Sequence, residues 1–364
     1  MREPREVVLT APAKVNLHLG IYPGRDERGY HRADSLMAAL ELADIVRVRE
    51  VDGVASAASR EVSAGASAGV AENPIEPVVT MTFADGLPPM DVPPRSNTVY
   101  KAIMNLAANL APRDACGEAG ANLSPRDDRG EANLAPCDAR VTSLQVTVEK
   151  HVPSQAGLGG SSSDAASVLL ALCKLWGLDR DDPRVVEAAR QTGADVPFFL
   201  DGRPALLVGA GDVLSRTYEV PGSRGASRDE VPGSTEAVPV VLVKPEAGIS
   251  TVTAYRAFDE KPEEPQRPDA MGAALAENDV PAMAAALYNN LGAVAERMVP
   301  AVGEALAWLR RRQGVLGAQV SGSGSCVFAL CESHKAAEVA ARKANDEKSW
   351  WSCATCLGEG ARFC

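Results

Sequence analysis

The sequence is short of three features that would each point to a common class of protein. Aromatic residues make up only 4% of its 364 residues, so any core must consist mainly of Ala, Val and Leu. No apolar run approaches the roughly 18 residues that a membrane-spanning helix needs, and the N-terminus has no apolar segment typical of a secretory signal. Basic residues are outnumbered, with a formal charge of −11, which disfavours a nucleic-acid partner but permits a site for one nucleotide. We therefore expect a cytoplasmic protein without a membrane or nucleic-acid partner.

Cysteine is sparse as well. The eight cysteines are scattered, as expected of thiols in a reducing compartment. Cys353 and Cys356 form one CxxC pair, but a zinc site needs two further ligands, and only Cys364 lies near in the sequence. The preceding Trp350 and Trp351 favour local packing of this pair. We therefore predict that the protein's side chains form no metal site.

Length and composition favour two domains. A chain of 364 residues that is 46% hydrophobic can bury sizeable cores. A stretch rich in Pro, Gly and Ser at about 215–237 is a candidate linker or long loop. Segments near 51–75 and 111–140 are interpreted as surface excursions. The second contains a short repeat, ANLxPxD, whose copies begin at residues 108, 121 and 132, too close together for a solenoid.

Local patterns predict both strands and helices. Helices are expected at 97–110, with Asn97 as N-cap, and from the serine run to Gly177. Residues 193–212 are expected to form a turn and a strand pair. Further strands are expected at 5–10, 13–21, 141–153 and 237–245, and around a glycine turn within 319–331. Further helices are expected at 181–193, over much of 270–313 and at 334–345.

The run PSQAGLGGSSSDAAS, residues 153–167, lies between a predicted strand and a predicted helix. Its glycines at 157, 159 and 160 let the backbone approach a phosphate without a β-carbon in the way. The start of a helix adds unpaired N–H groups and about half a positive charge, and serines 161–163 add hydroxyls. A plain Gly-Ser turn is the alternative, and the lysine of the GxxxxGK[ST] loop is absent. Asp164, in the first turn, is interpreted as favouring the helix dipole.

Three motifs occur in the order found in one superfamily of small-molecule kinases. APAKVNLHL (11–19), the glycine–serine run and VSGSGSCVFAL (320–330) together resemble the three motifs of the GHMP kinases, and they span almost the whole chain. The resemblance implies an α+β fold. Residues 1–215 would form an ATP-binding domain like the second domain of ribosomal protein S5, and residues 238–345 a ferredoxin-like domain. It also implies ATP as co-substrate, with Mg²⁺.

Two longer segments narrow the resemblance to one branch of the superfamily. Residues 11–37, which contain GYH, and 193–212, which contain GADVPFF, are similar to the kinases that phosphorylate the 2-hydroxyl of a cytidine-diphosphate derivative of methylerythritol. These act in the non-mevalonate pathway to isoprenoid precursors. A homoserine- or mevalonate-type kinase is one alternative, and a binding or regulatory protein on a degenerate kinase fold is another. Whether the protein is a monomer or a homodimer stays open.

The resemblance assigns the chemistry to two charged residues. Asp195 would be the base that accepts the proton of the attacking hydroxyl, whereas a turn-forming Asp before Pro is the plainer interpretation. Lys14 would lie against Asp195 and keep it ionised, although a lone lysine is normally solvated. Asn16 lies on the same face of the strand as Lys14 and would contact the substrate, with a structural hydrogen bond as the alternative.

Aromatic side chains would hold the cytosine. Tyr30 would stack on the base, and His31 would read its Watson–Crick edge. Ordinary packing of a Tyr-His pair before a helix is the alternative. Tyr255 would stack on the opposite face of the base, and Thr251 would bond to the substrate.

The remaining contacts would surround the phosphates and the reacting end of the substrate. Lys150 would contact the diphosphate, although His151 stands where many relatives have a second basic residue. Gly322 and Gly324 would let the backbone lie close to the reacting end, unless they form a plain hairpin turn. Ser161 stands where relatives often have a glycine and is tolerated if its φ is ordinary. The ATP-binding residues that the resemblance implies are Pro153, Ser154, Gln155, Ala156, Gly157, Leu158, Gly159, Gly160, Ser161, Ser162 and Ser163.

Overall fold

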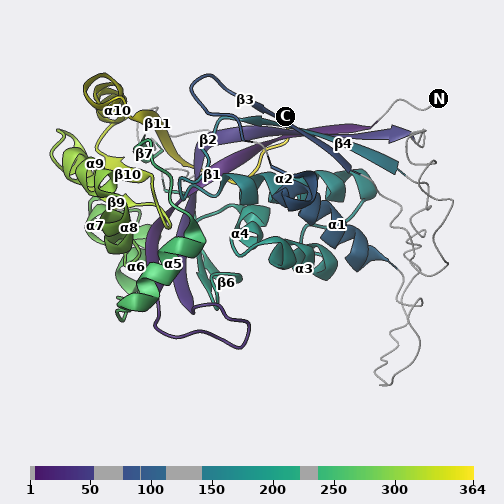
Figure 1. The fold of residues 1–364 in the computed structure, drawn as a ribbon, viewed down its shortest axis with the longest axis horizontal. Coiled ribbons are helices and arrows are strands. Elements are labelled where there is room, and N and C mark those ends of the chain that lie inside the picture. Colours follow the sequence, from purple (N-terminus) through teal and green to yellow (C-terminus); the bar gives the residue numbers. More distant parts are fainter. Residues whose placement is uncertain (1–4, 53–76, 91, 112–141, 222–236) are drawn as a thin grey trace, which may run out of the picture.

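The computed structural model describes residues 5–52, 77–90, 92–111, 142–221 and 237–364. The excursions predicted near 51–75 and 111–140, and most of the stretch at 215–237, lie outside the described residues. The described chain forms two halves, 5–221 and 237–364, that lie side by side (Figure 1).

The first half is a sheet with helices packed against one face (Figure 1). Two long strands, which the loop 22–32 connects, pair antiparallel along almost their full length. In chain order the elements of the first half are β1 Glu6–Ile21, β2 Ala33–Asp52, β3 Pro77–Phe83, the 3₁₀ turn η2 Pro94–Ser96, α1 Thr98–Leu110, β4 Thr142–Lys150, α2 Gly160–Trp176, α3 Pro183–Thr192, α4 Val196–Asp201, β5 Ala205–Val208 and β6 Val213–Thr217. The two long strands are β1 and β2.

The second half adds a smaller sheet and six helices within the described residues. Its elements are β7 Pro239–Lys244, α5 Thr251–Glu260, α6 Asp269–Glu277, α7 Val280–Ala285, β8 Tyr288–Asn289, α8 Gly292–Met298, α9 Pro300–Arg310, β9 Val315–Val320, β10 Val327–Cys331, α10 His334–Lys348 and β11 Trp351–Gly358. The strand order β3-β4-β2-β11-β7-β10-β9 shows that β11 joins the sheets of both halves. Leu357 of β11 pairs with Leu40 of β2. This connecting strand lies beyond residue 345, where the predicted second domain stops.

Small aliphatic residues form the core, as the scarcity of aromatic residues predicts. Twelve of the 17 residues of α2 are buried, because α2 packs on the sheet and is covered by α1, α3 and α4. Burying a side chain such as Val168 or Leu172 stabilises the fold by about 1.5–3 kcal/mol. The packing of α2 therefore fixes the position of the glycine loop that precedes it.

Most of the predicted elements are confirmed, including one predicted cap on each of two helices. The side chain of Asn97 accepts a hydrogen bond from the N–H of Val99 at 2.9 Å, and Gly177 ends α2 with a φ of +70°. Two expectations are wrong. The short helix α4 occupies part of the predicted turn, and the strand β2, not a helix, follows His31. Both segments are buried on several sides, so their apolar runs show no clear period. In the described part of the chain, no helix is long and apolar enough to cross a membrane.

Candidate active site

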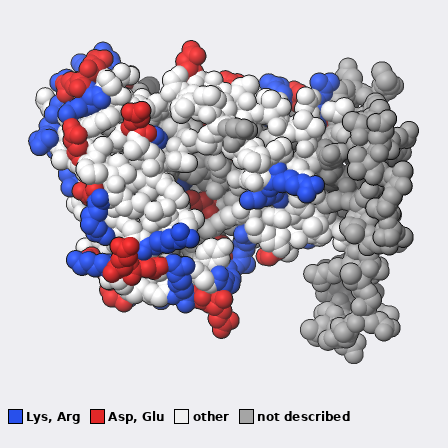
Figure 2. Space-filling model, viewed as in Figure 1, with Lys and Arg blue, Asp and Glu red and all other residues white. Residues whose placement is uncertain are grey.

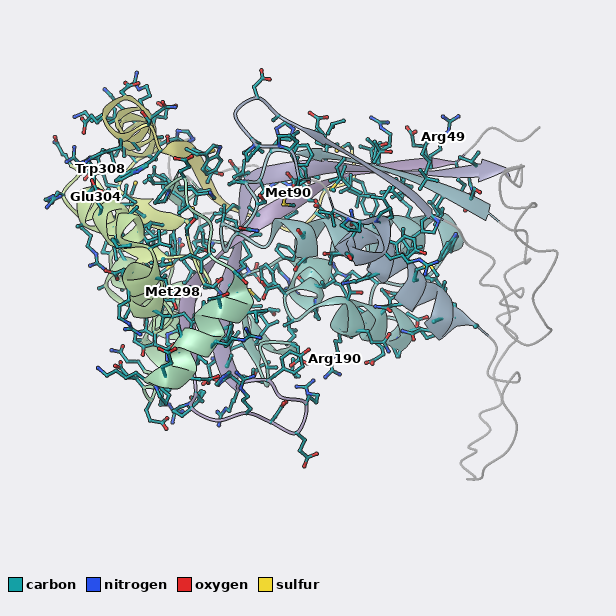
Figure 3. The ribbon with its side chains drawn as sticks, in the orientation of Figure 1. Arg49, Met90, Arg190, Met298, Glu304 and Trp308 are labelled. Atoms are coloured by element: carbon teal, nitrogen blue, oxygen red, sulfur yellow. The ribbon has the colours of Figure 1, made fainter. Side chains whose placement is uncertain are left out.

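A cavity of about 670 Å³ is lined by residues of both halves. Figure 2 shows the surface hollowed between them. Lys14 and Asn16 of β1, the glycine loop before α2, and Gly322 and Ser323 of the β9–β10 turn all line it. Met90, which Figure 3 labels near the middle of the molecule, also lines it. Three segments that are far apart in the sequence therefore converge on one cavity.

The glycine loop is pressed against β1 and the β9–β10 turn. Gly157 and Gly159 have φ values of +73° and +72°. A β-carbon on Gly157 would lie 2.0 Å from the carbonyl oxygen of Ser321, and one on Gly159 would lie 2.9 Å from Cγ of Lys14. The N–H of Lys14 donates to the carbonyl of Leu158 at 2.9 Å. Side chains at these two positions would push the loop away from its neighbours, so both positions require glycine.

Helix α2 begins where the loop meets the cavity. Gly160, Ser161 and Ser162 line the cavity, and the first N–H groups of a helix have no helical carbonyl partner. With the helix dipole, they form an anion site. Ser161 is not among the described residues with positive φ, so its predicted tolerance is consistent with its backbone. Gln155 has a φ of +52°, a left-handed conformation that costs about 1–2 kcal/mol and that local sequence patterns did not predict.

The predicted ATP-binding residues occupy this part of the cavity with one exception. Ser163 is fully buried within α2 and does not line the cavity. The other ten predicted residues, 153–162, all line it. Phosphate contacts at this end would therefore come from residues before the second turn of α2.

Lys14, Asn16 and Asp195 form a polar group beside the loop that could perform acid–base chemistry. Lys14 Nζ lies 3.6 Å from Asp195 Oδ2 and donates to Asn16 Oδ1 at 2.6 Å. Lys14 is 3% exposed, whereas the Asp195 side chain is 37% exposed. The carboxylate therefore opens onto the cavity while the cation is held behind it. This arrangement can accept a proton and stabilise the negative charge that develops on a reacting oxygen.

Sequence reasoning missed two residues, one that supports Asn16 and one that supports the β9–β10 turn. Ser35 of β2 accepts a hydrogen bond from the Asn16 amide at 2.9 Å. Asn289 of β8 donates to the carbonyls of Val320 and Gly322, both at 2.8 Å. Ser35 lies opposite β1 in the sheet, and β8 pairs with β1. Only the strand pairing reveals them, because neither residue stands in a recognisable motif.

The β9–β10 turn brings one predicted glycine to the cavity and not the other. Gly322 has a φ of +56°, and a β-carbon there would lie 3.4 Å from Lys14 Nζ. Gly324 does not line the cavity and packs against Ile249 and Val320. Ser323, which the sequence left unassigned, lies 3.1 Å from Thr251, Oγ to Oγ1.

Aromatic residues of the loop 22–32 and of α5 line the same cavity. Tyr30 is 58% exposed. Tyr255 lies deeper: burial raises the pKa of its hydroxyl, and the charge of Asp195 raises it by a smaller amount. The rings of His31 and Tyr255 lie 5.5 Å apart, tilted by 32°. Tyr30, His31, Tyr255 and Thr251 all line the cavity.

The ring nitrogens of His31 are already placed against protein acceptors. Nδ1 lies 3.0 Å from the carbonyl oxygen of Tyr22, and Nε2 lies 2.9 Å from Oδ1 of Asp259. His31 lines the cavity, and that its ring reads the edge of a base stays a prediction. Tyr30 and Tyr255 remain available for stacking.

Lys150 does not present a free charge to the cavity. Its ammonium group is buried against Asp44 and lies 2.6 Å from Asp164 Oδ2. Burial alone would lower the pKa of Lys150, but the two carboxylates outweigh that effect and raise it. Lys150 still lines the cavity at the start of α2, but the predicted diphosphate contact would have to compete with two carboxylates.

Asp164 is the clearest correction to the sequence interpretation. It is 4% exposed and forms an ion pair, so it is not a solvated acid that favours the helix dipole. Burial raises its pKa to about 7; the charge of Lys150 opposes this rise, and that of Asp44 adds to it. Asp44 also accepts the N–H groups of His151 and Val152, at 2.5 and 2.7 Å. We call Lys150, Asp44 and Asp164 the buried triad.

Known proteins match both halves of the chain. Residues 129–203 match the GHMP kinases N terminal domain, and residues 271–348 match GHMP kinases C terminal. The 4-diphosphocytidyl-2-C-methyl-D-erythritol kinase of one strain of Methylorubrum extorquens is 33% identical over 346 residues, which are 94% of this chain and 95% of that protein. The protein of the same name from Pelotomaculum thermopropionicum is 32% identical over 92% of this chain and 93% of its own length.

Solved structures agree with these matches. A crystal structure of 4-(cytidine 5'-diphospho)-2C-methyl-D-erythritol kinase is 29% identical, with a TM-score of 0.61 that covers 98% of this chain and 100% of that one. Homoserine kinase from Cytophaga hutchinsonii has a TM-score of 0.63 at 17% identity, over 99% of this chain and 97% of that one, and shows the shared fold alone. The predicted α+β fold of the GHMP kinases is confirmed.

Proposed function

We propose that this chain, which belongs to the 4-diphosphocytidyl-2-C-methyl-D-erythritol kinase family of the GHMP kinases, transfers the γ-phosphate of ATP to the 2-hydroxyl of 4-diphosphocytidyl-2-C-methyl-D-erythritol. The products are the 2-phosphate and ADP, in the non-mevalonate pathway to isoprenoid precursors. The observation that carries the proposal is the Lys14–Asp195 pair, 3.6 Å apart, beside the glycine loop. A phosphate donor site and an acid–base pair thus share one cavity.

The triphosphate of ATP would lie on the glycine loop and the start of α2. Gly157 and Gly159 leave the space that a β-carbon would fill, and the first N–H groups of α2 supply positive potential. We propose that ATP enters as its Mg²⁺ complex, with the ion neutralising charge on the β and γ phosphates. The hydroxyls of Ser161 and Ser162, which line the cavity, are oxygen donors of the kind that Mg²⁺ prefers.

Asp195 would accept the proton of the substrate's 2-hydroxyl. The oxygen of that hydroxyl would attack the γ-phosphorus in line with the leaving ADP. The ammonium group of Lys14, 3.6 Å from Asp195 Oδ2, would place a positive charge beside the oxygen on which negative charge develops. Asn16, which accepts from Lys14 and donates to Ser35, fixes the direction of the ammonium group.

The cytosine would lie at the far end of the cavity, between Tyr30 and Tyr255. Stacking a base on an aromatic ring contributes about 1–3 kcal/mol. Thr251 and Ser323, whose hydroxyls lie 3.1 Å apart, would bind the substrate between the base and the reacting carbon. Homoserine and mevalonate carry no base and could not use the stacking of Tyr30 and Tyr255. A preference for the cytidine substrate over these two alcohols would therefore support this part of the proposal.

The test is a coupled assay of ADP release with purified protein, ATP, Mg²⁺ and 4-diphosphocytidyl-2-C-methyl-D-erythritol, and with homoserine or mevalonate instead. Asp195→Asn should lower kcat by about 10²–10⁴-fold, because the base is lost, with an unchanged circular dichroism spectrum. Asp201→Asn is the matched control, since Asp201 ends the same helix α4 and pairs with Arg203 outside the cavity. Near-normal turnover by Asp195→Asn would rule out its role as base.

Three further assignments stay proposals. We retain residues 1–215 and 238–345 as the two domains, with β11 as a strand that lies after both. We propose a cytoplasmic location, where ATP is available. Assembly as a monomer or a homodimer would be measured by light scattering of the purified protein.

A further inference from the structure

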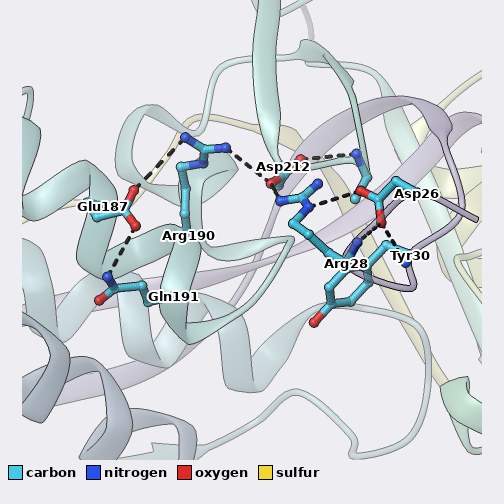
Figure 4. Close-up of polar contacts among 8 residues, drawn as sticks. Asp26, Arg28, Tyr30, Glu187, Arg190, Gln191 and Asp212 are labelled. Atoms are coloured by element: carbon cyan, nitrogen blue, oxygen red, sulfur yellow. Dashed lines mark hydrogen bonds and ion pairs between the residues drawn. The ribbon is translucent and has the colours of Figure 1, made fainter.

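The loop 22–32, which connects β1 and β2, is held from two sides. On one side, the Arg28 guanidinium bridges Asp26 at 2.9 Å and Asp212 at 3.1 Å. Asp212, which lies before β6, also pairs with Arg190 of α3 at 3.5 Å (Figure 4). The N–H of Tyr30 donates to Asp26 at 2.9 Å (Figure 4). These contacts fasten the loop to the first half of the molecule.

On the other side, Asp259 of α5 fastens the same loop to the second half. Its Oδ1 lies 2.9 Å from Nε2 of His31, and its Oδ2 accepts a hydrogen bond from Arg25. Hydrogen bonding from Arg25 and the charge of His31 lower the pKa of Asp259, although burial opposes them. Asp259 is therefore an anion that joins α5 to the loop.

The His31 ring is packed against aromatic residues at the wall of the cavity. It is 5% exposed, it packs edge-on against Phe258 at 5.7 Å, and it lies against Tyr255 at 5.5 Å. Its two nitrogens face the carbonyl of Tyr22 and the carboxylate of Asp259. The 2.9 Å approach of Nε2 to the Asp259 carboxylate and the packing of both aromatic neighbours therefore fix where the ring lies.

We propose that Asp259 is a positioning residue for the cytidine end of the substrate, acting through His31. The Nε2–Oδ1 contact fixes the ring, the ring fixes the orientation of Tyr255, and the adjacent Tyr30 is held at the cavity wall by the same loop. This inference rests on the proposed function. Asp259 does not line the cavity, so it acts without touching the substrate.

Because the loop is held on two sides, a substitution on each side distinguishes the proposed role of Asp259 from a general stiffening of the loop. Asp259→Asn keeps the size of the side chain but removes the charge that holds His31. Arg28→Gln is the matched control, because it frees the same loop from Asp212 and removes the guanidinium 5.6 Å from the Tyr30 ring centroid, without touching His31. Arg28 is half exposed and does not line the cavity, so its loss leaves the core intact.

Steady-state kinetics measure the difference. For Asp259→Asn we expect KM for 4-diphosphocytidyl-2-C-methyl-D-erythritol to rise about tenfold. We expect kcat and the KM for ATP to stay within about twofold of the wild-type values. The reason is that an interaction remote from the reacting hydroxyl contributes equally to the ground state and the transition state. For Arg28→Gln we expect a rise below about threefold. Equal KM values for the two variants, or a fall confined to kcat, would overturn the role of Asp259.

A second measurement does not depend on activity. In proton NMR spectra, the carbon-bound ring protons of His31, identified by their loss in His31→Gln, report the position of the ring. Their chemical shifts should stay the same in Arg28→Gln and change in Asp259→Ala; unchanged shifts in Asp259→Ala would overturn the inference. A wild-type protein that does not turn over the cytidine substrate would overturn the proposed function instead, whatever the spectra show.

Discussion

Replacing Asp164 by Asn removes one carboxyl from the buried triad and keeps its shape. Asp164 lies 2.6 Å from Lys150, and its other oxygen, Oδ1, has no hydrogen-bond partner in the described part of the chain. Burial, more than any charge, raises its pKa to about 7. The amide leaves Lys150 paired with Asp44, so the fold should tolerate it. The informative quantity is how stability depends on pH.

The sign follows from the direction of the shift. Between pH 4 and 7 the folded protein keeps a proton on Asp164, while the unfolded chain has released it. Stability from this group is therefore complete below pH 4 and is lost as the pH rises through about 7. A rise of the pKa from 3.8 to about 7 corresponds to about 4 kcal/mol, at 1.36 kcal/mol per pH unit.

His18 acts in the opposite direction over nearly the same range. Its ring stacks on Tyr288, and burial lowers its pKa from 6.5 to about 4, although Asp34 opposes the shift. As the pH falls from 6.5 to 4 the unfolded chain binds this proton and the folded protein does not, so stability falls by about 3 kcal/mol. Carboxyls with lowered pKa, such as Asp182 and Asp201, act mainly below pH 4.

In the wild-type protein these two effects oppose each other between pH 4.5 and 6.5, so each partly masks the other in the pH dependence of the free energy of unfolding. Asp164→Asn leaves His18 unopposed, so stability should increase with pH by up to about 1.4 kcal/mol per unit. Urea unfolding at several pH values, extrapolated linearly to water, measures this. A variant profile parallel to that of the wild type would refute the buried, protonated state of Asp164.

Two further substitutions test the same reasoning and the phosphate loop. His18→Gln should give the reverse profile, with stability falling by about 3–4 kcal/mol as the pH rises from 4 to 7, measured by the same unfolding series; an unchanged profile would contradict it. Gly157→Ala should raise KM for ATP at least tenfold, because the new β-carbon would lie 2.0 Å from Ser321. Gly177→Ala, at the other end of α2 with a φ of +70° and open space, should cost only stability, about 1 kcal/mol. Equal KM values for the two glycine variants would argue against the loop.

The parts of the site that the sequence predicts are those with local backbone requirements. Gly157, Gly159 and Gly322 all have positive φ, a conformation that favours glycine because it has no β-carbon, although Gln155 adopts it too. Asp195 could be predicted for a different reason, since its motif resembles that of related kinases. The same information does not reveal Ser35 or Asn289, whose roles depend on strand register.

Segments without a clear polar face, or with distant partners, were the hardest part of the fold to predict. Helix α4 has only six residues, five of them buried, so no polar face marks its period. β2 is buried along much of its length, so it too lacks a polar face that would mark its period. β11 could not be placed from its sequence, because its partners are β7 and β2, which lie more than 100 residues earlier.

The error at Asp164 shows how magnitude decides between a local and a tertiary effect. The helix dipole favours an acid in the first turn by about 0.3–1 kcal/mol, whereas burial at this position shifts the carboxyl by about 4 kcal/mol. The larger effect comes from burial of α2 against the sheet; Asp44 of β2 adds to it, and Lys150 of β4 opposes it. With Asp164 ionised, the triad carries one net negative charge beneath the phosphate loop, and with Asp164 protonated it is neutral. Attraction for a triphosphate must therefore come from the backbone N–H groups and dipole of α2, not from Lys150.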